Sequence, residues 1–134
     1  LNWVDLPESS QELLPEISRV VDKFSTLSRI VLCGMGGSSL GPEVIALTYK
    51  KEIFIFDSTD PNYALHAIGK DLSSTLVVVS SKSGSTIETS SQRALFQSQF
   101  EKAGLNAFLF LIASMYLNRE CSQNIANHRS QHHL

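Results

Sequence analysis

Residues 30–39, with the sequence IVLCGMGGSS, decide the fold because they join a short apolar run to a glycine-rich loop. Residues 30–33 are apolar at every position, which is typical of a strand that a parallel sheet buries on both faces. The loop that follows leads into a helix predicted over residues 41–49. A buried strand, a glycine turn and a helix in this order indicate an α/β fold.

The alternation of apolar strands and helices continues along the chain. Strands are expected over three further apolar runs: residues 53–56, 76–79 and 107–112. Helices are expected over three further segments: residues 9–27, where apolar side chains recur at helical spacing after a capping Ser9 or Ser10, residues 63–68 and residues 86–102. The pattern predicts a layered α/β fold with a parallel sheet and right-handed crossovers.

Composition limits the class of protein. The 134 residues are 43% apolar and 18% charged, which suits one folded domain and excludes both a disordered chain and a large two-domain enzyme. Eleven basic against thirteen acidic residues indicate no nucleic-acid partner. The longest apolar stretch, residues 105–117, is shorter than the ~20 residues of a membrane helix, so no membrane partner is expected.

Neither end of the chain nor its cysteines indicate export or metal binding. Residues 1–5 lack the basic and apolar regions of a secretory signal. Cys33 and Cys121 form no CxxC pair and no metal-ligand spacing, so we expect a reduced, cytoplasmic chain without a metal or another cofactor.

Two loops combine small and hydroxyl-bearing residues at the ends of predicted strands, where α/β sheets bind ligands. Residues 34–39 hold three glycines and two serines, whereas residues 80–86 hold five hydroxyl side chains, Lys82 and Gly84. Glycines allow close approach to an anion, and unpaired amides at a helix start attract one. Together the loops favour binding of a phosphate on a small molecule. Glycine turns, hydroxyl helix caps and a solvated Lys82 are the alternative interpretation.

Dinucleotide binding is a further alternative. Gly34 and Gly36 begin a Rossmann-like fingerprint, and Asp57 lies near the position of a ribose-binding acid. However, the third glycine of that fingerprint is replaced by Ser39. A P-loop is excluded because the sequence contains no GxxxxGK[ST] motif.

Three short segments resemble the phosphoglucose isomerase family. Residues 34–42 (GMGGSSLGP) and 81–89 (SKSGSTIET) are similar to two signatures of its bacterial branch, which includes transaldolase fusions, and DSTDP at 57–61 lies between them. The resemblance runs from about Trp3 to Asn106. It implies a flavodoxin-like, three-layer αβα sugar isomerase (SIS) domain over residues 28–113, with a helical segment, residues 1–27, packed on it. Residues 114–134 match nothing in the family and are expected to form a disordered polar tail.

The resemblance also implies a ligand and its contacts. Substrate contacts are expected from Gly37 and Ser38, and a phosphate loop from Ser81, Lys82, Ser83, Gly84, Ser85 and Thr86. The implied reaction interconverts glucose 6-phosphate and fructose 6-phosphate through an enediolate, which requires a base. In the family the catalytic residues come from later sequence, so none is assigned here and the chain alone is expected to be inactive. A homodimer is possible, and a stand-alone phosphosugar-binding regulatory module is the alternative function.

Overall fold

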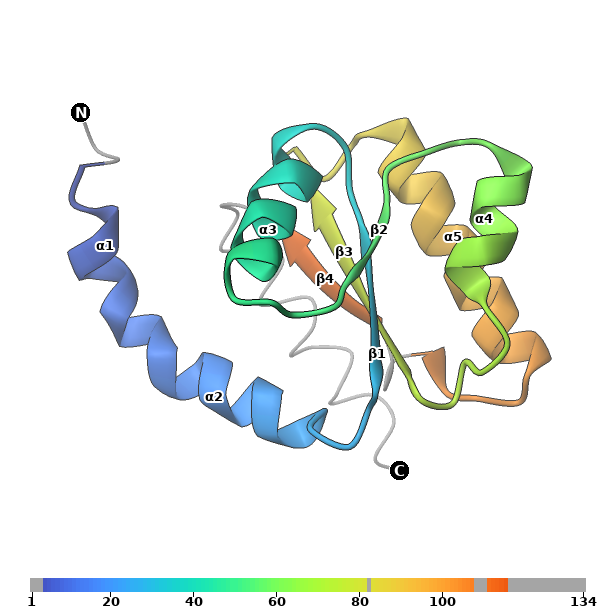
Figure 1. Ribbon diagram of the computed structural model, residues 1–134, viewed down its shortest axis with the longest axis horizontal. Helices are drawn as coiled ribbons and strands as arrows, with labels where there is room; N and C mark the ends of the chain where they lie inside the picture. The colour runs from blue at the N-terminus through green and yellow to red at the C-terminus, as the bar shows by residue number, and fades with distance from the viewer. Residues whose placement is uncertain (1–3, 82, 108–110, 116–134) are drawn as a thin grey trace, which may run out of the picture.

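The fold is built around one parallel sheet. A computed structural model describes residues 4–81, 83–107 and 111–115 of the chain. Four strands pair in the order β2-β1-β3-β4 (Figure 1). Their bounds are Arg29–Cys33 for β1, Phe54–Phe56 for β2, Thr75–Ser81 for β3 and Leu111–Met115 for β4. The expected parallel α/β sheet is therefore confirmed.

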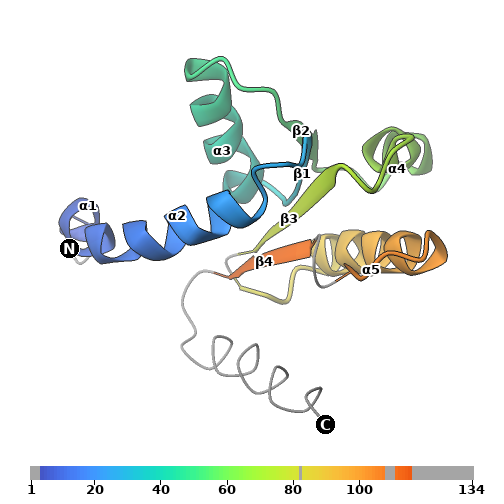
Figure 2. The same cartoon turned by 90° about the horizontal axis from the view of Figure 1, so that it is seen from below.

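Helices cover the two faces of this sheet unequally. Helix α3 (Gly37–Thr48) joins β1 to β2 on one face, whereas α4 (Pro61–Ile68) and α5 (Ile87–Lys102) lie on the other (Figure 2). The chain first moves from β1 to β2, then reverses direction to reach β3 and β4. With crossovers of one hand, this reversal places the first helix and the later two on opposite faces. The strand order is that of flavodoxin-like folds.

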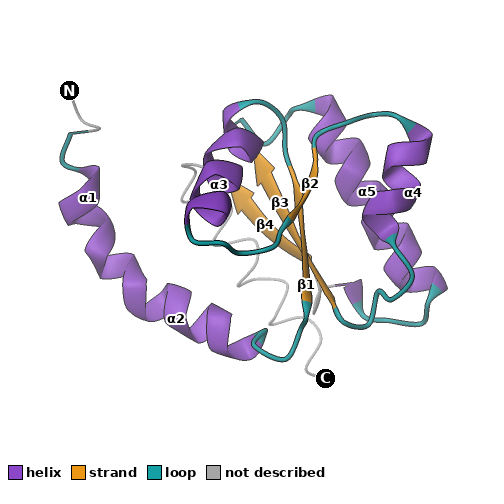
Figure 3. Ribbon diagram, viewed as in Figure 1, coloured by secondary structure: helices purple, strands orange, loops and turns teal. Residues whose placement is uncertain are grey.

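The N-terminal segment is helical, but its bounds differ from those predicted. Helix α1 (Leu6–Ser9), the 3-10 helix η1 (Ser10–Leu13) and α2 (Leu14–Lys23) follow one another directly. Ser9 has helical backbone angles, φ −66° and ψ −23°, so it lies within the helical run and does not begin it. Figure 3 shows this run extending away from the sheet. None of the described side chains of η1 and α2 is buried, and the packing of residues 1–27 on the domain stays a prediction.

Helix α3 begins four residues before the predicted position 41, at Gly37. Gly36 turns the chain with φ 57° and ψ −127°, and its carbonyl oxygen accepts hydrogen bonds from the amides of Ser39 (3.0 Å) and Leu40 (2.9 Å). Half of the predicted loop, residues 37–39, is thus the first turn of the helix, because the carbonyl oxygen of Gly36 accepts the first backbone hydrogen bonds of α3.

The last strand also differs from its predicted position. β4 spans residues 111–115 instead of 107–112, and it therefore includes Ser114 and Met115, which were assigned to the tail. Its pairing with β3 carries it further, with Ser80 opposite Ser114 and Ser81 opposite Met115. The backbone groups of the neighbouring strand decide where β4 ends, and the residue types of β4 itself do not show those groups. The rest of the predicted tail, 116–134, lies outside the described residues.

Candidate functional site

The two predicted loops leave neighbouring strands at the same edge of the sheet. β1 and β3 are hydrogen-bonded partners, with Cys33 opposite Val79, so the loops that follow them start side by side. From there the chain enters α3 on one face and α5 on the other (Figure 1). This is a topological switch point, the place where open α/β sheets bind their ligands.

Gly34 allows the two loops to approach closely. A Cβ atom at this position would lie 3.1 Å from the carbonyl oxygen of Ser80 and 3.3 Å from that of Ser38. A side chain here would therefore push the first loop away from the end of β3. Gly36 is needed for a different reason, because its positive φ of 57° is a conformation that side chains disfavour.

The second loop is shaped by its own hydroxyl groups. Ser81 is buried, and its Oγ accepts a hydrogen bond from the amide of Gly84 at 3.0 Å. Ser83 Oγ accepts from both the amide and the hydroxyl of Ser85, each at 3.2 Å. Thr86 Oγ1 lies 3.4 Å from Ser83 Oγ. These contacts bring the predicted residues together, except Lys82, which lies outside the described residues.

Each loop ends at a helix N-terminus that faces the candidate site without a side-chain cap. Thr86 precedes α5 and Gly36 precedes α3, and neither position carries a side-chain hydrogen bond to the first turn among the described residues. In α3 the amides of Ser38 and Ser39 donate to the carbonyl oxygens of Met35 (3.3 Å) and Gly36 (3.0 Å). Each helix N-terminus nevertheless has partial positive charge. Gly37 is exposed and Ser38 half-buried at the start of α3. Amides and hydroxyls in this arrangement can bind an anion without a fixed countercharge.

Ser39 has a structural role. Its side chain is fully buried, and its hydroxyl donates a 2.9 Å hydrogen bond to the carbonyl oxygen of Gly36. In a dinucleotide fingerprint this position is a glycine that allows close packing of helix and strand. The buried serine therefore weakens the dinucleotide alternative.

Two buried polar residues of α5 were missed in the sequence. Thr89 and Gln92 lie on the same helix face as Phe96 and Phe100, at positions where an apolar side chain is expected. Polar residues continuing an apolar stripe were the available signal. Gln92 reaches from α5 to the loops that follow β1 and β2, because its Nε2 lies 4.0 Å from Met35 Sδ and donates to Ser58 O at 3.3 Å.

The described residues contain neither a cluster of metal ligands nor a membrane-spanning helix. No three His, Cys, Asp or Glu side chains among them gather to hold a metal ion. None of the helices in that part of the chain combines the length and the apolar character of a membrane span.

Comparison with known proteins shows which proteins this chain is similar to. The fold and its paired loops first define the chain as a doubly wound α/β domain with a candidate site at the switch point. No family model matches the sequence. A curated glucose-6-phosphate isomerase from Chlamydia felis is 36% identical over 72% of this chain, and a chloroplastic one from Arabidopsis thaliana is 40% identical over 59%. The matched part of the chain is homologous to glucose-6-phosphate isomerases.

Solved structures agree with this assignment. A glucose-6-phosphate isomerase from Chlamydia trachomatis superposes with a TM-score of 0.72 at 32% identity over 80% of this chain. A hypothetical protein from Thermus thermophilus superposes with a TM-score of 0.80 at 30% identity over 97%. The chain spans 19% and 14% of the two curated relatives, and 22% and 32% of the two solved chains.

Proposed function

We propose that this chain is the phosphosugar-binding SIS domain of a glucose-6-phosphate isomerase. The observation that carries the proposal is the pair of helix N-termini that meet at one switch point, each preceded by a loop that resembles a family signature. The ligand is the phosphate group of glucose 6-phosphate or fructose 6-phosphate. A homodimer and a cytoplasmic location remain predictions.

The chemistry of the second loop supports a phosphate ligand. Ser83, Gly84 and Ser85 are exposed, and Thr86 is half-buried, so their amides and hydroxyls can reach a bound group. A phosphate dianion at the first turn of α5 is favoured by the partial positive charge of the helix end. From the resemblance we expect Lys82 to contribute its positive charge and Gly37 and Ser38 to contact the sugar.

Binding and turnover are separate parts of this proposal. Aldose–ketose isomerisation moves a proton between adjacent carbons, which requires a positioned base and stabilisation of the enediolate. The family resemblance assigns these groups to sequence outside residues 34–89. We therefore propose that the 134-residue chain binds the substrate but does not convert it.

Calorimetry with fructose 6-phosphate tests the proposed binding, with fructose as the ligand control. We expect heat of binding from the phosphorylated sugar and none from fructose at the same concentration, because the phosphate supplies the charge that the helix ends attract. A coupled assay should detect no turnover. Equal binding of both sugars would contradict the phosphate site, and turnover by the purified chain would contradict the missing catalytic groups.

The substitution Thr86→Val tests the position of the phosphate. It keeps the shape of the side chain and removes its hydroxyl, so binding of fructose 6-phosphate should weaken by about 1.5–3 kcal/mol, the range for a hydrogen bond to a charged group. Ser91→Ala is the matched control, because its exposed hydroxyl bonds to Ile87 O within α5. Unchanged affinity in Thr86→Val would place the phosphate elsewhere.

A further inference from the structure

Gln92 is an unusual residue for its position. It lies on the face of α5 that packs on the sheet, where Phe96 and Phe100 follow it, and only 3% of its surface is exposed. Burial of an amide is unfavourable unless its polar atoms find hydrogen bonds. A leucine would fill such a position without that penalty, so the amide calls for a specific explanation.

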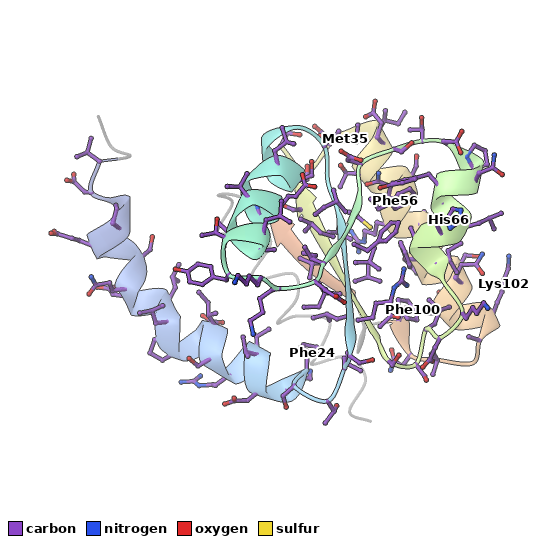
Figure 4. All side chains as sticks on the ribbon, in the orientation of Figure 1. Phe24, Met35, Phe56, His66, Phe100 and Lys102 are labelled. Carbon is purple, nitrogen blue, oxygen red and sulfur yellow. The ribbon has the colours of Figure 1, made fainter. Side chains whose placement is uncertain are left out.

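The side-chain amide of Gln92 joins three segments of the candidate site. It comes from the helix that follows β3, and its Nε2 donates to the carbonyl oxygen of Ser58 at 3.3 Å in the loop after β2. The same nitrogen lies 4.0 Å from Met35 Sδ in the loop after β1. Met35, labelled in Figure 4, directly precedes the glycines that begin α3. One side chain of α5 therefore contacts the loops that follow β1 and β2.

The contact with Ser58 extends to the start of α4. Ser58 Oγ accepts a hydrogen bond from the amide of Asp60 at 3.0 Å. The carboxylate of Asp60 in turn accepts from the amides of Asn62 (2.8 Å) and Tyr63 (3.0 Å), which caps the helix. A shift of Ser58 would therefore disturb the capped start of α4.

The side-chain carbonyl oxygen of Gln92 is a buried hydrogen-bond acceptor that the described part of the chain leaves without a donor. Among the described residues its Oε1 has no hydrogen-bond partner, nor does Thr89 Oγ1 one turn earlier, although both atoms are buried. Buried polar atoms without partners are rare in native proteins, and each one needs an explanation. Gln92 contacts the loops after β1 and β2, so we relate these unpaired atoms to the binding loops.

We propose that Gln92 is a positioning residue of the sugar-phosphate site. Its amide holds the glycine loop against the loop after β2, so that Gly37 and Ser38 are in place before the sugar arrives. A preorganised loop binds more tightly because less ordering is required on binding. The effect on affinity rests on the proposed function, whereas the contact between the loops can be tested without ligand.

The test is Gln92→Met, which keeps the length of the side chain and removes both the donor and the unpaired Oε1. In the ligand-free 134-residue chain, we expect the amide NMR signals of residues 35–38 and 57–60 to shift or broaden. Affinity for fructose 6-phosphate should fall about 5- to 10-fold, and the melting temperature should stay the same or rise. Gln97→Met is the matched control, because Gln97 is exposed on the same helix and, among the described residues, its side chain donates to Glu101 within that helix.

The outcomes separate this inference from the proposed function. If the wild-type chain does not bind fructose 6-phosphate, the proposed function fails, and the ligand-free signals still decide whether Gln92 holds the loops. Unchanged loop signals and unchanged affinity in Gln92→Met would show that Gln92 only fills space. If that variant does not fold, Met35→Leu removes the sulfur contact from the other side, and unchanged loop signals there would overturn the inference.

Discussion

The two faces of the sheet differ in how completely the chain covers them. On the closed face, α4 and α5 bury one continuous cluster: Val31, Cys33, Phe56, Ala67, Val77, Val79, Phe96 and Phe100. On the open face, Ile30 of β1 is 39% exposed, and Val44 and Ile45 of α3 are 62% and 61% exposed. The strands are apolar toward both faces, yet the face that α3 covers keeps exposed apolar side chains beside the buried Leu32.

The difference follows from the number and kind of helices on each side. Because side chains alternate along a strand, Val31 and Cys33 face α5 while Ile30 and Leu32 face α3. Two helices pack on the closed face and bring large aromatic rings to it. The ring centroids of Phe96 and Phe56 lie 6.2 Å apart in an edge-on arrangement. The open face receives α3 alone, while α2 leaves its own apolar side chains exposed. Apolar composition therefore shows which residues could be buried. Whether a helix covers that face of the sheet decides which of them form the core.

The largest expected effect is the loss of a closed-face ring. Phe96 is fully buried and contacts Phe56 and Phe100, so Phe96→Ala should lower the free energy of unfolding by about 3–5 kcal/mol. Ile45→Ala on the open face should change it by less than about 0.5 kcal/mol. Urea denaturation measures both. A large loss in Ile45→Ala would show that the open face is covered in solution.

A second pair of substitutions examines how α4 is attached. Arg29 donates to the carbonyl oxygens of Ile68 (3.1 Å) and His66 (3.0 Å) at the end of this helix. A Cβ on Gly69, where φ is +66°, would lie 2.8 Å from Arg29 Nη1, so Gly69→Ala combines backbone strain with a displaced guanidinium. We expect a loss of about 2 kcal/mol of unfolding free energy.

The control for this pair is Gly104→Ala at the end of α5. Gly104 has a similar φ of +70°, but nothing lies within 4 Å of an added Cβ. Only the backbone strain remains, so a loss of about 1 kcal/mol is expected by the same denaturation measurement. Equal losses at the two glycines would mean that Arg29 moves aside without cost.

The smallest expected effect is a pH dependence from the closed face. Burial raises the pKa of the Cys33 thiol to about 12 from 9.0. Below pH 9 the thiol is protonated in both states, and its titration leaves stability unchanged. Between pH 9 and 12 the unfolded chain releases the proton and the folded chain keeps it, so stability falls as pH rises, by about 1.4 kcal/mol at pH 10.

Denaturation at pH 8 and pH 10 measures this loss in a Cys121→Ser background. Cys33→Val serves as the control, because it removes the titrating group and keeps an apolar side chain at the site. The loss between the two pH values should be about 1.4 kcal/mol smaller in the valine variant. The same loss in both variants would indicate that Cys33 reaches solvent and that the closed face opens.

Much of the candidate site could be predicted from sequence, because its residues belong to short local patterns. Glycines after an apolar strand and hydroxyls before a helix indicate the two loops, and the structure brings those loops together at neighbouring strands. The start of α3 was mispredicted because Gly36 closes the first turn through its own carbonyl oxygen. The roles of Gln92 and Arg29 could not be predicted, since their partners lie more than thirty residues away in sequence.

The amino-acid sequence alone determined the order of strands and helices, the two glycine- and hydroxyl-rich loops and the resemblance to one family, because these depend on residue type and on spacing over a few positions. Only the tertiary structure decided which apolar residues are buried, since burial depends on whether a helix covers that face of the sheet. It also decided that two separate loops share the side-chain amide of Gln92, because this residue meets Met35 and Ser58 only after β1, β2 and β3 have paired. The composition of a loop depends on neighbouring residues in the sequence. The covering of a sheet face by a helix, and contacts between distant residues, exist only once the chain has folded.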